Sequence, residues 1–162
     1  TVDINNSIHA TLVILAHKFR EKEIVVEKDL AIDLPVFQAS CSGLNQIWTN
    51  LLDNAIDAAP PQGRITIRTW VEKTLHGDRS EICIRITDNG SGIPVECQAH
   101  IFDPFYTTKA VGVGTGIGLG IVHRIVEQNG GSIHFASEPG KTEFVVRLPI
   151  DNAQAPTETQ TS

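Results

Sequence analysis

Asp88-Asn89-Gly90-Ser91-Gly92-Ile93-Pro94 places a carboxylate directly before two closely spaced glycines. The alternating segment 81–87 before it predicts a strand that ends at Asp88. Glycine lets a ligand approach the main chain closely, and strand ends beside tight turns often carry binding residues. We therefore expect a ligand-binding site at this strand end.

A second glycine-rich stretch, Gly112-Val113-Gly114-Thr115-Gly116-Ile117-Gly118-Leu119-Gly120, has glycine at every other position and continues into an apolar helix. Free backbone N–H groups at such a junction suit a phosphate group. The sequence contains no G-x-x-x-x-G-K-[ST] P-loop. Its glycine runs also lack the early strand–turn–helix unit of a dinucleotide-binding domain. The pattern therefore indicates a phosphate-binding loop of another class.

An amphipathic helix is predicted between Ser42 and Pro60, with its apolar residues on roughly a third of the helical wheel. On the polar side, Asn50 and Asn54 lie one turn apart, and their amide oxygens can hold a divalent cation. Asparagine is a mediocre helix former, so the pair lowers the intrinsic stability of the helix. Either an exposed polar face or a binding role would explain why both asparagines are there. Together with Asp88 as acceptor for an exocyclic amine and the second glycine run, the pair describes a site for a purine nucleoside triphosphate.

The remaining segments complete a single predicted domain over residues 1–150. We expect helices at 7–19, 95–101 and 117–129, strands at 23–27, 64–71, 132–136 and 143–148, a hairpin loop at 75–79 and a hinged flap at 102–109. The strand at 23–27 is expected to be short and at an edge. Residues 151–162 have little to bury and are predicted to be a disordered C-terminal tail.

Composition narrows the class of protein. The chain has 162 residues, is 41% hydrophobic and 20% charged, and contains no apolar run near the ~20 residues of a membrane span. We expect a soluble domain without direct membrane contact. Three cysteines without CxxC spacing and the lack of a secretory signal favour a reducing, cytoplasmic location. The net charge of −6 gives no support for nucleic-acid binding. The absence of methionine predicts that the sequence is a fragment of a longer protein.

Four segments occur in the order of the sequence boxes of sensor histidine kinases. Asn50-Leu51-Leu52-Asp53-Asn54-Ala55 resembles the N box and Asp88-Asn89-Gly90-Ser91-Gly92 the first G box. Phe102-Asp103-Pro104-Phe105 resembles the F box and Gly114-Thr115-Gly116-Ile117-Gly118-Leu119 the second G box. The resemblance implies the GHKL (Bergerat) ATP-binding fold. That fold is an α+β two-layer sandwich in which helices cover one face of a mixed, mostly antiparallel sheet.

The resemblance, which runs from about residue 2 to residue 150, also implies roles for single residues. Asp88 would bind the adenine amino group, and Gly92, in the same turn as Gly90, would allow close approach to the base. Asn54 would hold Mg²⁺ between the phosphates, and Asn50 would line the same catalytic pocket. The implied nucleotide-binding set is completed by Phe102, Phe105 and Lys109 in the lid, by Gly114, Thr115, Gly116, Gly118 and Leu119 around the phosphates, and by Thr142 near adenine.

As a member of this family, the chain would be the ATP-binding catalytic domain of a two-component sensor kinase. It would donate the γ-phosphate of Mg-ATP to a histidine on a dimerisation domain of a homodimeric parent protein, with a response regulator downstream. Asp57 stands where many histidine kinases have a lysine or arginine, which leaves the source of phosphate-neutralising charge open. None of the six histidines is followed by Glu or Asp, so we expect the acceptor histidine outside this sequence.

Three other functions remain compatible with the sequence. A clamp-type ATPase, as in gyrase, heat-shock chaperones or mismatch-repair proteins, would place a glutamate where Asn50 stands, because glutamate can activate water and an amide cannot. An anti-sigma-factor serine kinase shares the same boxes and needs no acceptor histidine of its own. A non-catalytic nucleotide-binding interaction module is disfavoured because all four boxes are filled.

Overall fold

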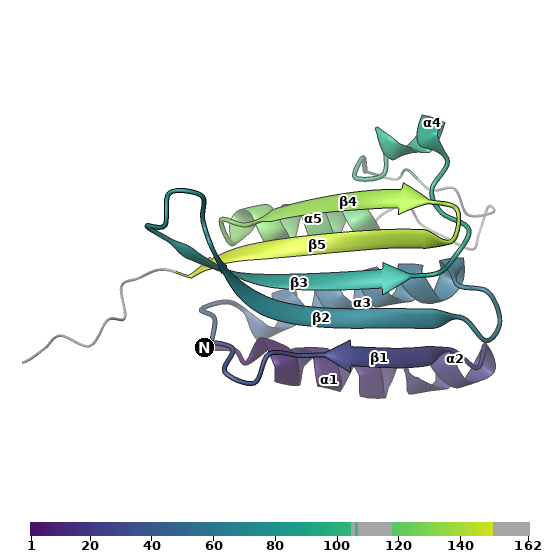
Figure 1. Ribbon diagram of the computed structural model, residues 1–162, viewed down its shortest axis with the longest axis horizontal. Helices are drawn as coiled ribbons and strands as arrows, with labels where there is room; N and C mark the ends of the chain where they lie inside the picture. Colours follow the sequence, from purple (N-terminus) through teal and green to yellow (C-terminus); the bar gives the residue numbers. More distant parts are fainter. Residues whose placement is uncertain (105, 107–117, 151–162) are drawn as a thin grey trace, which may run out of the picture.

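The computed structural model describes residues 1–104, 106 and 118–150. The chain forms two layers, with a sheet on one side and helices packed against one of its faces (Figure 1). The predicted flap is described only in part, and the predicted tail at 151–162 lies outside the described residues.

The sheet has five strands in the order β1-β2-β3-β5-β4. β1 runs parallel to β2, and every other neighbouring pair is antiparallel, which confirms the predicted mixed, mostly antiparallel sheet. Glu23 has a positive φ of 55°, so the first strand starts later than the predicted 23–27. The strands are β1 (Val25–Asp29), β2 (Arg64–Lys73), β3 (Ser80–Asp88), β4 (Ser132–Glu138) and β5 (Lys141–Ile150).

Three of the helices, α1, α3 and α5, lie behind the sheet in Figure 1. The single helix predicted for 7–19 was wrong in its bounds, because the helix begins earlier and is interrupted at Leu15. It begins early because Asp3 caps it by accepting from the Asn6 N–H at 3.1 Å. The helices are α1 (Ile4–Ile14), α2 (Ala16–Glu21), α3 (Cys41–Ala58), α4 (Val95–Gln98) and α5 (Gly118–Gln128).

α3 is the centre of the core. Its apolar stripe packs against the isoleucines on the inner face of β2 and β3, and Trp48 on this stripe is fully buried. The indole Nε1 of Trp48 donates to Ser7 Oγ at 3.0 Å, and that hydroxyl donates to Asn45 Oδ1 at 2.5 Å. This chain of bonds fastens α1 to α3 and satisfies the buried indole. With the apolar stripe against the sheet, the polar residues of α3 are left on its outer side.

Candidate functional site

Asp88 ends β3 on the helix-covered side of the sheet and is only 5% exposed. Its Oδ1 accepts from the Gly90 N–H at 2.9 Å. Oδ2 accepts no hydrogen bond from any described residue. Every fully buried side-chain oxygen or nitrogen in the described residues has a hydrogen-bond partner, so the Oδ2 atom retains some access to solvent. Burial raises the pKa of the Asp88 carboxyl above its ordinary value, and the bond from Gly90 opposes that shift. A desolvated carboxylate with one open oxygen suits a donor group on a ligand.

A pair of hydroxyls lies beside Asp88. Thr142 is opposite Asp88 in the β3–β5 register and is 4% exposed. Its Oγ1 is 2.7 Å from Ser137 Oγ, which accepts from the Ile93 N–H at 2.7 Å. Sequence analysis missed Ser137, for which the only signal was a hydroxyl residue just before the β4–β5 turn. Ser137 orients Thr142 and ties the turn after Asp88 to the β4–β5 hairpin.

The glycines after Asp88 are required by packing as well as by any ligand. A Cβ on Gly90 would lie 2.3 Å from the backbone oxygen of Ala58, at the end of α3. Gly92 has a φ of +85°, and its Cβ would lie 2.8 Å from the backbone oxygen of Glu138. The Gly140 N–H also donates to Gly90 O at 2.8 Å. The turn is therefore held between α3 and the β4–β5 hairpin.

We expect Gly92→Ala to lower the free energy of unfolding of the nucleotide-free protein by about 3 kcal/mol or more, because it adds a backbone clash to a left-handed conformation. Gly140→Ala is the matched control. Gly140 has a similar φ of +89°, but nothing lies within 4 Å of its Cβ position. The control should lose only about 1 kcal/mol. Urea unfolding measures both changes, and equal losses would show that packing against Glu138 is unimportant.

The polar side of α3 is linked to the start of α5. Asn50 Nδ2 donates to Gly118 O at 3.2 Å, and Asn50 Oδ1 accepts from Gln46 Nε2 at 3.1 Å. Asn54 is half-buried, and its side chain makes no hydrogen bond to another described residue. The structure thus brings the two asparagines next to the end of the second glycine run, with the Asn54 amide oxygen available to a cation.

Two lysines that sequence analysis missed flank the same helix. Lys18 Nζ donates to Asp53 Oδ1 at 2.5 Å, and this hydrogen bond raises the pKa of Lys18, with a smaller contribution from the charge of Asp57. Lys22 Nζ donates to the carbonyls of Ile56 and Ala59 at 2.7 and 2.9 Å, so it caps the end of α3. The acidic residues of the α3 polar face are therefore partly balanced from α2.

The F-box segment packs on the first turns of α5. The Phe102 ring lies 5.2 Å from the ring of His123 and 5.9 Å from that of Phe135 on β4. A Cβ on Gly120 would lie 3.2 Å from Phe102 O, so a side chain there would require the F-box segment to shift slightly. Leu119 is half-buried and packs against the core. The other predicted site residues of this region, Phe105, Lys109, Gly114, Thr115 and Gly116, lie outside the described residues.

The family described as "Histidine kinase-, DNA gyrase B-, and HSP90-like ATPase" matches residues 40–152. This chain belongs to that family. Sensor histidine kinase ZraS of Escherichia coli (strain K12) is 37% identical over 151 residues, which cover 93% of this chain and 31% of ZraS. The chain thus spans about a third of the length of this relative.

Solved structures give the same family context. The nucleotide-free catalytic domain of histidine kinase ThkA superposes with a TM-score of 0.79 at 28% identity and covers 91% of this chain and 93% of that domain. ThkA has also been solved in complex with the response regulator protein TrrA. Full-length ShkA in complex with AMPPNP gives a TM-score of 0.75 at 26% identity, covering 91% of this chain and 30% of ShkA. The predicted family and the predicted fold of a histidine kinase catalytic domain are confirmed.

Among the described residues, no helix combines the length and apolar character needed to cross a membrane.

Proposed function

We propose that this domain binds Mg-ATP between α3, the turn at 88–94 and the start of α5, and donates the γ-phosphate to a histidine on a dimerisation domain of the parent protein. The observation that supports it best is the buried Asp88 carboxylate, with one oxygen bonded to Gly90 and the other open, in a chain of the histidine kinase-like ATPase family. Adenine presents an exocyclic amine that fits such an acceptor.

The adenine end of the pocket would be formed by Asp88 and Thr142. Asp88 Oδ2 would accept from the amino group, and the Thr142 hydroxyl, oriented by Ser137, would lie beside it. Gly90 and Gly92 would hold the turn at the distance that the base requires. Burial and strand register support these proposed roles, together with the resemblance to the family's sequence boxes.

The phosphate end would be formed where α3 meets α5. The first backbone N–H groups of α5, from Gly118 onward, suit phosphate oxygens. Gly114, Thr115, Gly116 and Lys109 are proposed to complete this part of the site. Asn50 would fix α5 relative to α3 through its bond to Gly118 O.

Mg²⁺ fits the donor set at this end, because the Asn54 amide oxygen has no other partner among the described residues and Mg²⁺ prefers oxygen ligands shared with substrate phosphates. Asn54 would hold the ion. When bound, Mg²⁺ would neutralise charge on the phosphates during transfer. In the described ranges no group of three His, Cys, Asp or Glu residues could hold a metal ion, so the ion would depend on the nucleotide for its other ligands.

The partners proposed are the dimerisation domain that carries the acceptor histidine and a response regulator that receives the phosphoryl group from it. ThkA, solved with its response regulator, supports the second partner. Residues 1–150 would be the catalytic unit, and the parent would be a homodimer in the cytoplasm.

Phosphotransfer tests the proposal directly. Residues 1–162 are mixed with the separately produced dimerisation domain of the parent protein and with ATP labelled on the γ-phosphate. We expect label on that domain as an acid-labile, base-stable phosphohistidine, and none when its acceptor histidine is replaced by alanine. Tight ATP binding without any transfer to the dimerisation domain would leave only a nucleotide-binding module.

A further inference from the structure

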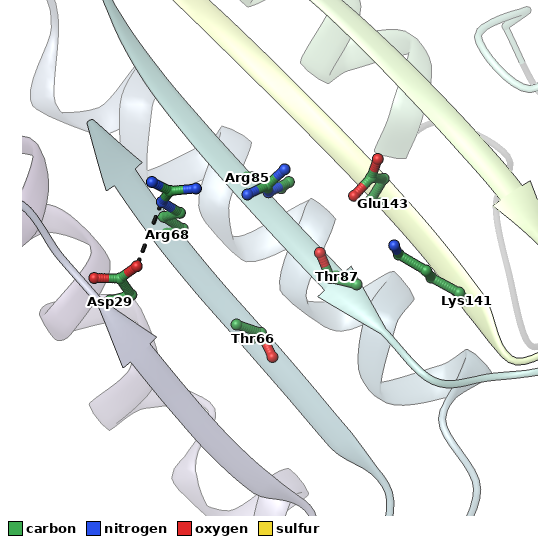
Figure 2. A pocket seen from close by; sticks show the side chains of 7 residues that line it. All are labelled: Asp29, Thr66, Arg68, Arg85, Thr87, Lys141 and Glu143. Carbon is green, nitrogen blue, oxygen red and sulfur yellow. Dashed lines mark ion pairs between the residues drawn. The ribbon is translucent and has the colours of Figure 1, made fainter. Parts of the chain in front are cut away.

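The open face of the sheet, opposite the helices, carries a hollow of about 380 Å³ between β1, β2, β3 and β5 (Figure 2). We call it the open-face groove. It lies on the reverse side of the strands that carry Asp88 and Thr142, because side chains alternate along a strand. Nucleotide and a ligand in the groove would therefore occupy different faces of the sheet. It is lined by Asp29, Thr66, Arg68, Arg85, Thr87, Lys141 and Glu143.

Two arginines in the open-face groove are direct cross-strand neighbours. Arg68 on β2 is opposite Arg85 on β3. Like charges at such positions destabilise a sheet. Both guanidinium groups lie over the Trp70 ring, at 5.1 and 5.2 Å. Arg68 Nε is also 3.3 Å from Asp29 Oδ2, whereas Arg85 forms no ion pair with any described residue. Within the part of the chain that the structure describes, Arg85 therefore has no acidic partner.

A second cation without an ion pair to any described residue lies on the β5 side of the groove. Lys141, the first residue of β5, forms no ion pair within the described ranges, although Glu143 lines the same hollow. Thr66 and Thr87 are cross-strand neighbours, and neither hydroxyl is hydrogen-bonded to a described residue. Figure 2 shows Arg85 and Lys141 on either side of Thr87. Two cations without an ion pair to any described residue, and two hydroxyls without a described hydrogen-bond partner, thus face one hollow together with the Glu143 carboxylate.

Their spacing suits one bound group over Thr87. Thr87 on β3 pairs with Glu143 on β5. Arg85 lies two residues before Thr87 on β3, and Lys141 lies two residues before Glu143 on β5. Because the strands are antiparallel, the two cations lie on opposite sides of this pair. Two residues correspond to roughly 7 Å along a strand, a distance that extended arginine and lysine side chains can cover. A guanidinium can donate two parallel hydrogen bonds to a phosphate, while an ammonium acts as a compact charge.

We propose that the open-face groove binds a small, multiply charged oxyanion of the phosphate class, held by Arg85 and Lys141 above the hydroxyls of Thr66 and Thr87. The three cations of the lining outnumber its two carboxylates, Asp29 and Glu143, so the groove has a net positive charge. An oxyanion bound on the side of Arg85 and Lys141 would compensate that charge and relieve the repulsion between Arg85 and Arg68. Because the cations are accessible to solvent, binding should be in the millimolar range and should weaken as ionic strength rises.

The test follows the backbone amide signals of ¹⁵N-labelled residues 1–162 in an excess of Mg²⁺ and a non-hydrolysable ATP analogue, during titration with inorganic phosphate and, separately, with succinate. We expect saturable shifts at residues 66, 85 and 87. Stronger binding of phosphate than of succinate identifies a phosphate ligand, and equal binding of both supports the shared oxyanion chemistry with a dicarboxylate as the alternative source.

Arg85→Gln and Lys141→Gln should each weaken phosphate binding about five- to tenfold, since each removes one charged hydrogen-bonding partner. Arg64→Gln is the matched control, because Arg64 lies on the same face but is already paired with Glu27 at 3.4 Å. It should change the affinity less than twofold. Unchanged affinity in the Arg85→Gln, Lys141→Gln double variant would overturn the proposal, as would shifts confined to the turn at 88–94 and the start of α5. Failure of the ATP analogue to bind would count against the proposed function and leave this test intact.

Discussion

Asp88→Asn should reduce the affinity for ATP by about 100-fold, as measured by calorimetry. Asparagine can keep the bond from the Gly90 N–H with its Oδ1, which places the amide NH₂ where the open carboxylate oxygen now lies. Two donors, the amide and the adenine amine, would then face each other, and a charged hydrogen bond would be lost. The loss should be in binding alone, because the substitution keeps the shape of the side chain.

The same substitution should leave the melting temperature unchanged or raise it. Burial raises the pKa of Asp88, so the folded state binds a proton more readily than the unfolded state. The contribution of Asp88 to the free energy of unfolding therefore falls as the pH rises from the pKa of Asp88 in the unfolded state to its higher pKa in the folded state. The loss persists at neutral pH. The amide introduced by Asp88→Asn carries no charge and avoids that cost. Asp33→Asn, at an exposed loop position, should change neither property. Unchanged ATP affinity in a folded Asp88→Asn protein would remove Asp88 from the proposed site.

α3 shows what the sequence predicts well. Both its apolar stripe and its polar face follow from a helical period that is a local property, and Trp48 and Leu51 are buried as that period requires. The break at Leu15 was not predictable in this way. Ile8, Leu15 and Phe19 keep the helical spacing across the break, because both short helices pack the same stripe against the core.

The parallel pairing of β1 with β2 depends on contacts between segments far apart in the sequence, which periodicity does not report. The same is true of the candidate site. The motifs identified Asp88 and the asparagines, but the contact between Gly92 and Glu138 and the Ser137 hydroxyl bond arise only when the β4–β5 hairpin is placed beside the first glycine turn.

The open-face groove also could not be recognised from the sequence alone. Its residues read as the solvent-facing positions of alternating strands, and only the register of β2 against β3 places Arg68 opposite Arg85. Lys18 was missed for a related reason, since its partner Asp53 lies 35 residues further along the chain. Charges brought together by packing need the folded structure to be recognised.

The side chain of Asn50 bears on whether bound ATP is hydrolysed. In ATP-hydrolysing relatives a glutamate at this position activates water, whereas both polar groups of the Asn50 amide are engaged, Nδ2 with Gly118 O and Oδ1 with Gln46 Nε2. An amide also has no useful basicity near neutral pH, and general-base catalysis contributes about 10²- to 10⁴-fold. Bound ATP should therefore be positioned for transfer but remain largely unhydrolysed, because phosphoryl transfer relies on a correctly placed acceptor.

Residues 1–162 alone should therefore turn over ATP at least about 100-fold more slowly than they transfer phosphate to a supplied dimerisation domain. A phosphate-release assay measures the first rate, and transfer of label measures the second. Asn54→Ala should abolish transfer by removing the proposed Mg²⁺ ligand, and Asn50→Ala should slow transfer without creating hydrolysis, because it loosens the contact between α3 and α5. Brisk hydrolysis by the domain alone, lost on Asn54→Ala but retained on Asn50→Ala, would mean that another group activates water, and a clamp-type ATPase would then replace the kinase as the proposed function.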